Sequence, residues 1–282
     1  MIQIFMHSFL KPWMFLSLGL LSTAGFAHYP YIAPLNYQTF NNYSAVVSGF
    51  YDNPFVSEIA IKNFKFHYHT PDGEKIEIAD DAWAKTQTLS SFSLENKQDG
   101  TYRIRGVKQG SASRFALVDR QWKALIQAKR DEAKPLKANV VYQSDLKKNS
   151  KVKTVETQEI IETFISRRTM SDVSVKHVHE GFDVRFISHP NTLKVNQPIQ
   201  LQVVDSAQGV KDVKASVLAQ SYAFERTDRV YQTLQSDDKG HLNFVIKDQG
   251  QYLLTVDYQQ PFTAKGDQLK RYKYTLAFNV VE

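Results

Sequence analysis

The stretch Ile199–Val204, IQLQVV, decides the fold class of this chain. Its apolar residues alternate with glutamine before the closing valines, which is the pattern of a β-strand with one buried face. Leu242–Ile246 (LNFVI) and Tyr252–Val256 (YLLTV) follow with the same aliphatic and aromatic content. About seven such segments fall in the last third of the chain, which is the size and spacing of an immunoglobulin-like sandwich.

The same pattern extends towards the N-terminus. Short period-two segments alternate with turn signals such as Pro71-Asp72-Gly73 and Gln98-Asp99-Gly100. We therefore expect an all-β protein made of two β-sandwich domains, residues 28–175 and residues 176–282, with the C-terminal one immunoglobulin-like. One exception is predicted: Trp122, Leu125 and Ile126 lie at helical spacing within Asp119–Lys134, which favours a single short helix there.

The first 27 residues have the features of a secretory signal peptide. Lys11 is the single charged residue, an apolar run follows it, and Gly25-Phe26-Ala27 supplies small residues for cleavage. We expect export to the periplasm and cleavage after Ala27, which would make His28 the new N-terminus. Its amine and imidazole could then chelate one metal ion together.

Composition excludes several classes of site. The chain has no cysteine, so disulfides, thiolate nucleophiles and cysteine-ligated metals are ruled out. The net charge of +6 is scattered, and the lysine run around Lys147–Lys153 lacks the interleaved aromatics of a nucleic-acid patch, so no nucleic-acid partner is expected. No segment after the signal is apolar for long enough to span a membrane.

Histidine is the residue type left to carry a site, because no phosphate loop, dinucleotide fingerprint or nucleophile elbow is present. His67 and His69 stand two apart, and so do His177 and His179. On a strand this spacing places both imidazoles on one face, about 7 Å apart, where one ion can bridge them. The same spacing is common on polar strand faces that bind nothing. His189, before Pro190, and His241, after a turn, are expected to be structural or surface residues.

The ordered motifs along the chain resemble a bacterial family known as a domain of unknown function. That family is associated with the periplasmic component of cobalt/nickel uptake systems and with outer-membrane receptors. The resemblance covers nearly the whole chain after the signal, and it implies a two-part periplasmic β protein with a metal role in which His28 is the best-matched residue. It rests on Ala27–Tyr31, Thr70–Gly73, Asp99–Ile104, Glu162–Arg167, Ser188–Leu193, Asp238–Gly240 and Gly250–Tyr252.

Three functions follow from these observations. The leading one is a non-enzymatic periplasmic binding protein that captures a divalent transition metal (Ni or Co, or else Cu or Zn) for an uptake system, with His28, His67 and His69 as ligands and His177 and His179 as further candidates. The second is a carrier without metal that docks on an outer-membrane receptor or an inner-membrane transporter. The third is a copper histidine-brace enzyme built on His28, for which no further catalytic group is visible.

Overall fold

A computed structural model describes residues 29–128, 130, 137–223 and 230–282 of the chain. Within this part the chain is all-β, as predicted, and its helical content is three short 3-10 turns: η1 (Asp80–Ala82), η2 (Gln143–Asp145) and η3 (Gln220–Tyr222). In the described residues, no helix has the length and apolar character needed to cross a membrane.

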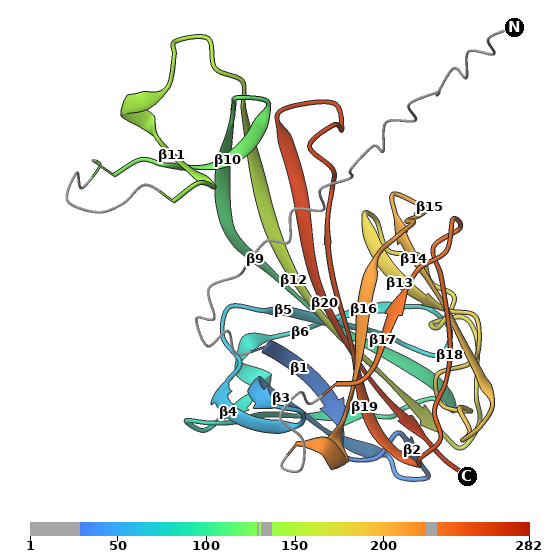
Figure 1. Cartoon of the computed structure of the whole chain (residues 1–282). Helices are drawn as coiled ribbons and strands as arrows, with labels where there is room; N and C mark the ends of the chain where they lie inside the picture. The colour runs from blue at the N-terminus through green and yellow to red at the C-terminus, as the bar shows by residue number, and fades with distance from the viewer. Residues whose placement is uncertain (1–28, 129, 131–136, 224–229) are drawn as a thin grey trace, which may run out of the picture.

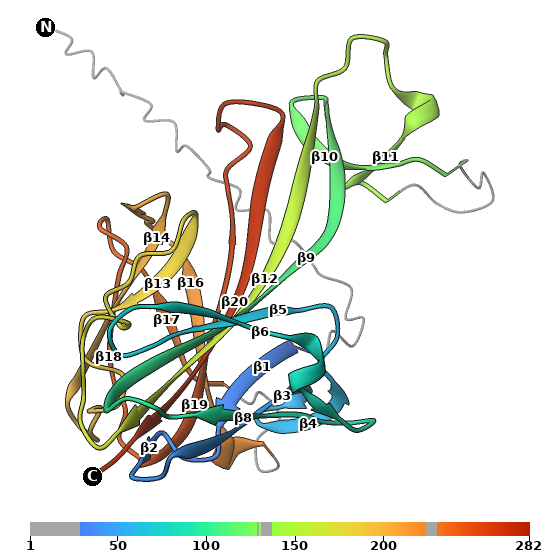
Figure 2. The ribbon, with the colours of Figure 1, turned by 180° about the vertical axis from the view of Figure 1, so that it is seen from behind.

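Three sheets build the molecule (Figures 1 and 2). The first, sheet A, consists of β1 (Tyr29–Pro34), β3 (Tyr43–Asn53), β4 (Val56–Ala60), β7 (Ala84–Lys85) and β8 (Ser90–Glu95). The last, sheet C, consists of β13 (Phe182–Phe186), β14 (Pro198–Asp205), β15 (Gln208–Gly209) and β18 (His241–Val245).

Sheet B is the central sheet and has 11 strands. Its two longest neighbours are β9 (Gly100–Val118) and β12 (Val152–Arg167), which pair antiparallel, and β12 pairs on its other side, in parallel, with β20 (Gln268–Val280). The remaining members are β2 (Gln38–Thr39), β5 (Lys65–His69), β6 (Lys75–Ile78), β10 (Gln121–Ile126), β11 (Val140–Tyr142), β16 (Lys214–Ala219), β17 (Val230–Gln235) and β19 (Gly250–Gln259).

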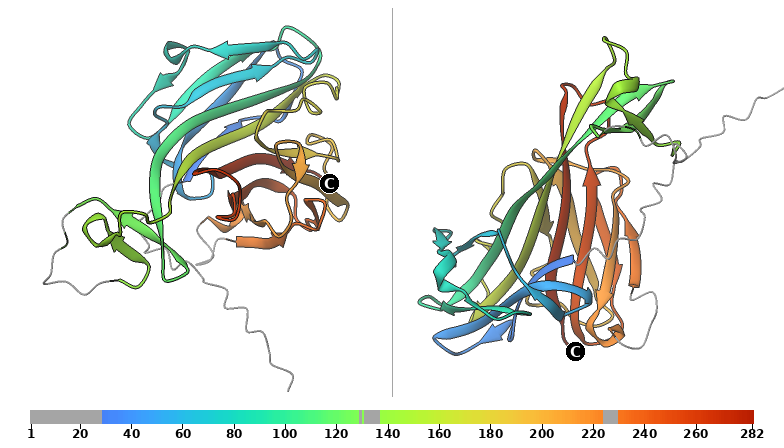
Figure 3. Two further views of the ribbon diagram at one scale, coloured as in Figure 1. Left: turned by 90° about the horizontal axis from the view of Figure 1, so that it is seen from above. Right: turned by 90° about the vertical axis from the view of Figure 1, so that its left-hand side faces the viewer.

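Both faces of sheet B are buried, so one sheet serves two sandwiches. Successive side chains of a strand point to opposite faces. On β12, Ile161 and Ile165 join the core formed with sheet A, whereas Ile160 and Phe164 join the core formed with sheet C. The central strands accordingly run between the N-terminal and C-terminal units (Figure 3).

The C-terminal unit has the two-sheet architecture expected of an immunoglobulin-like sandwich: β13, β14 and β18, with the two-residue β15 at the edge of their sheet, face β16, β17, β19 and β20 across a shared core. The expected division at residues 175/176 falls in the segment between β12 and β13. Because β12 from one side of that division pairs with β20 from the other, the two units are joined by continuous backbone hydrogen bonding.

The predicted short helix over 119–134 is wrong where the structure describes this stretch. Gln121–Ile126 form β10, which pairs antiparallel with the end of β9. The strand places Trp122 against Phe262, with nearly parallel rings whose centroids lie 4.9 Å apart. Tertiary aromatic contacts therefore override the local helical spacing.

Candidate metal centre

Strand β5 presents two histidines to one face of sheet B. Phe66 lies in the core beneath sheet A, and the alternation of the strand turns His67 and His69 to the opposite face. Both imidazoles are buried, with exposed fractions of 9% and 1%, and their ring centroids lie 5.4 Å apart. The predicted shared face of this pair is what the structure shows.

The segment between β12 and β13 brings the second pair onto the same face. Ser174 fixes this segment by donating its hydroxyl to the carbonyl of Thr101 on β9. Further along, Arg103 donates to the His177 carbonyl at 2.8 Å, and the His179 amide lies 3.3 Å from Asp183 Oδ2. Backbone contacts therefore hold both histidines over β5.

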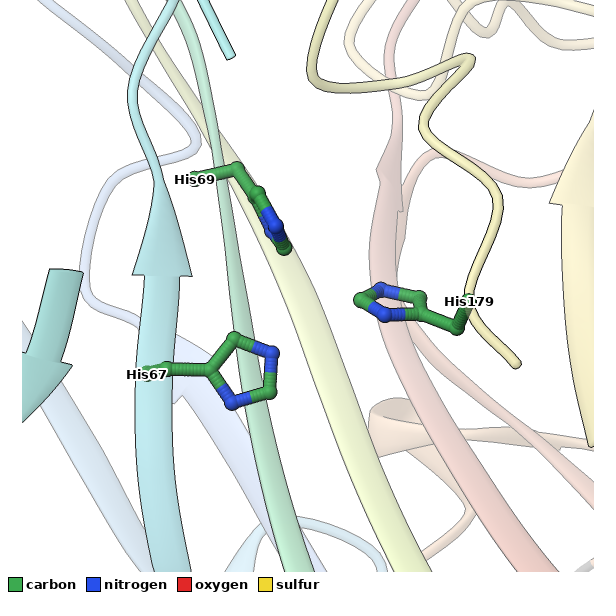
Figure 4. A group of neighbouring side chains, drawn as sticks. All are labelled: His67, His69 and His179. Atoms are coloured by element: carbon green, nitrogen blue, oxygen red, sulfur yellow. The ribbon is translucent and has the colours of Figure 1, made fainter. Parts of the chain in front are cut away.

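The four imidazoles form one cluster, the histidine cluster, made of His67, His69, His177 and His179. The ring of His177 stacks on that of His69 with centroids 4.0 Å apart, and the His179 centroid lies 5.3 Å from His69 and 5.8 Å from His67. One ring nitrogen from each of His67, His69 and His179 lies within 4.8 Å of the other two. Their rings point towards a common centre (Figure 4).

Three ring nitrogens of the cluster are buried without a hydrogen-bond partner in the described structure: Nε2 of His67, Nδ1 of His69 and Nε2 of His179. Buried polar atoms are nearly always paired, because an unpaired one loses its hydration without compensation. Three such nitrogens at one place point to a ligand-binding site.

Burial also keeps these imidazoles neutral. It lowers the pKa of His67 to about 4 and, together with the neighbouring His177, lowers the pKa of His69 to about 3. The pKa values of His177 and His179 are lowered as well, again mainly by burial. Neutral imidazole is the form that binds metals, so the cluster is ready to do so at neutral pH.

Beneath the cluster lies a buried ionic network that the sequence analysis did not identify. Glu162 on β12 pairs with Arg103 and Arg105 on β9, both arginines also reach Asp183 Oδ1 at 2.8 and 3.1 Å, and the Tyr274 hydroxyl donates to Glu162. Burial alone would raise the pKa of Glu162, but the two guanidinium groups outweigh it and hold that pKa well below its usual range. Two cations and two anions leave the network neutral.

The network touches the cluster through Glu162. Its Oε1 lies 3.7 Å from His179 Nε2, which is beyond hydrogen-bond distance. The available signal in the sequence is a charged residue, Glu162, inside the run Ile160–Ile165, whose other members are apolar except for Thr163.

The cluster fits a transition metal by residue type and needs only side-chain rotation to fit it by distance. Nitrogen ligands 2.0–2.1 Å from a tetrahedral ion lie about 3.4 Å from one another, so the three nitrogens must approach by about 1.4 Å at most. An all-imidazole set suits Zn, Cu, Ni or Co and does not suit the oxygen-seeking Mg or Ca.

Of the remaining predicted histidines, two lie outside the cluster and one lies outside the described residues. His28 lies outside the described residues, so a site built on its amine is not part of the described structure. His189 is structural, with Nε2 3.1 Å from Thr101 Oγ1, and His241 begins β18 and meets Asp237 at 3.2 Å.

Comparison with known proteins places the chain in a family. A family model described as Domain of unknown function (DUF4198) matches residues 25–260. No curated protein matches the sequence.

Solved structures match at low similarity. The chicken CNTN1 FN1-FN3 domains match with 10% identity and a TM-score of 0.23, covering 90% of this chain and 69% of that one. Escherichia coli alpha-2-macroglobulin activated by porcine elastase matches with 10% identity and a TM-score of 0.22, covering 89% and 20%. A marsupial T cell receptor matches with 10% identity and a TM-score of 0.21, covering 91% and 72%.

Proposed function

The chain belongs to the DUF4198 family, and from its histidine cluster we propose that it is a binding protein for one divalent transition-metal ion. His67, His69 and His179 are the ligands, and His177 is a fourth imidazole in contact with them. The observation that carries this proposal is the convergence of three buried ring nitrogens that have no partner in the described structure.

The arrangement suits capture and release better than permanent storage. Two histidines of the cluster stand on a strand of the central sheet, whereas the other two belong to the irregular segment between β12 and β13, which hydrogen bonds to β9 hold in place. His177 and His179 are more exposed than the β5 pair, and Val178 between them is exposed, so the ion enters and leaves from this side.

The proposal includes the cellular context read from the sequence. A signal peptide over residues 1–27 would deliver the protein to the periplasm, and the site would then hold Ni, Co, Cu or Zn for an uptake system. An outer-membrane receptor or an inner-membrane transporter is the partner to which the ion would pass. The protein acts as a binding protein, without chemistry on a substrate.

Calorimetric titration of Ni, Co, Cu and Zn into residues 28–282 tests the proposal. We expect one ion per chain and a loss of at least tenfold in affinity on His179→Gln, with His241→Gln as the matched control because His241 lies on the surface of β18. An unchanged affinity in His179→Gln would refute the cluster as the site.

The same titration on protein with one extra residue before His28 separates two sites. An affinity that is unchanged by the extra residue and lost in His179→Gln assigns binding to the histidine cluster. An affinity lost with the extra residue and kept in His179→Gln assigns it to the amine of His28 and overturns the proposal.

A further inference from the structure

The distal arm is built from the outer half of β9, from β10, β11 and the start of β12, and from the segment 260–267 beside them. It projects away from the two sandwiches (Figures 1 and 2). Its centre is aromatic: Phe262 stacks on Trp122 and meets Phe115 edge-on at 5.1 Å between centroids. This cluster shares no residue with the histidine cluster.

A lysine is buried beside these rings. Lys153 on β12 is 9% exposed, donates from Nζ to the Ala264 carbonyl at 2.6 Å, and lies 6.0 Å from the centroid of Trp122. Among the described residues, no carboxylate lies within ion-pair distance of this ammonium group. A buried charge is costly unless an opposite charge compensates it, and one carbonyl with one aromatic face supplies only partial charges.

Beside Lys153 there is space for a negatively charged group. A cavity of about 610 Å3 opens along the arm, which is within the range of small-molecule sites. It combines an apolar wall with polar groups. Lys151 adds a second ammonium group to the lining, and Asp267 is the one carboxylate in it. The wall is formed by Leu117, Trp122, Val152 and Phe262, and the polar lining by Asn149, Ser150, Lys151, Lys153 and Asp267.

We infer that the arm cavity binds a small organic anion with an apolar body. The anionic group pairs with Lys153 and Lys151, and the apolar body covers Trp122 and Phe262. This site stands apart from the histidine cluster and does not depend on the proposed metal function. Contact with the two aromatic rings supplies affinity for the apolar body of the ligand, and the buried Lys153 selects ligands that carry a negative charge.

Trp122 offers a direct readout. Residues 28–282 contain two tryptophans, Trp83 and Trp122, so the Trp83→Phe variant leaves the arm residue as the single fluorophore. Titration of this variant with octanoate, which does not absorb in the tryptophan range, is expected to change the fluorescence saturably. Octanamide, the neutral molecule of the same shape, is expected to bind at least tenfold more weakly. Equal responses to the two would overturn the inference.

Substitutions locate the charge. Lys153→Met keeps the aliphatic stem and is expected to reduce octanoate affinity at least tenfold, whereas Lys123→Met on β10, outside the cavity lining, should leave it unchanged. Because Lys151 is exposed, Lys151→Glu preserves folding even if Lys153→Met does not, and it should also weaken octanoate binding. Wild-type affinity in Lys151→Glu, or an equal loss in Lys123→Met, would refute the assignment.

Discussion

Acidification of the metal-free protein is expected to destabilise it well above the pH at which carboxylates titrate. The pKa of His67 falls from an ordinary 6.5 to about 4 in the fold, and that of His69 falls from 6.5 to about 3. Above pH 6.5 both groups are neutral in the folded and the unfolded chain, so they contribute no pH dependence. Below pH 6.5 the two histidines bind protons in the unfolded chain but not in the folded chain, so the free energy of unfolding falls as the pH is lowered.

The size of the effect follows from these two values. A histidine that is protonated only in the unfolded chain lowers the free energy of unfolding by about 1.4 kcal/mol per pH unit. Between pH 6.5 and pH 5 each of the two therefore lowers it by about 2 kcal/mol. Together His67 and His69 remove about 4 kcal/mol, a large part of the total stability of an ordinary domain. The lowered pKa values of His177 and His179 act in the same direction.

Urea unfolding in the presence of a chelator, at pH 7.5 and at pH 5, measures this loss. His69→Gln removes one of these titrating groups and should reduce the loss by about 2 kcal/mol. A wild-type loss below about 1 kcal/mol, or identical losses in wild type and His69→Gln, would show that the buried histidines do not resist protonation as the structure requires.

Three further outcomes are expected. A preferred metal at a free concentration 100 times its Kd should raise the unfolding free energy by about 2.7 kcal/mol in wild type and His241→Gln, and His179→Gln should lose that gain; equal gains in all three would contradict the site. Glu162→Gln leaves two buried guanidinium groups sharing one carboxylate, and should cost about 3–5 kcal/mol in urea unfolding; a cost below 1 kcal/mol would show the network to be dispensable. A Cβ at Gly106 would overlap the ring of Phe66, so Gly106→Ala should lower the unfolding free energy by about 1–3 kcal/mol, and an unchanged midpoint would contradict that packing.

Local pattern predicted the fold class because period-two alternation follows from strand geometry itself. It also placed His67 and His69 on one face, since residues two apart on a strand must share it. The spacing of Trp122, Leu125 and Ile126 gave a wrong prediction because three apolar positions also fit a helix. Pairing with the end of β9 and the contact of Trp122 with the distant Phe262 decide for the strand.

Long-range pairing could not be read from local pattern. The parallel pairing of β12 with β20 joins residues more than a hundred positions apart, and the residues of either strand do not indicate which strand it pairs with. The ionic network was missed for the same reason. Arg103 and Arg105 have the alternation of an exposed strand face, and they are buried by β13, which carries Asp183, and by the segment before it.

The place of β20 in the fold has a consequence for the order in which the chain folds. Tyr274, Leu276 and Phe278 complete the C-terminal core, whereas Ala277 on the other face packs with Tyr31 beneath sheet A. The C-terminal core therefore cannot close until residues 268–280 are available, and the contact of Ala277 with Tyr31 forms only then, although the larger core beneath sheet A uses no residue beyond Ile165. Such high contact order slows folding. The core beneath sheet A can therefore assemble before the C-terminal core, whose closure waits for β20.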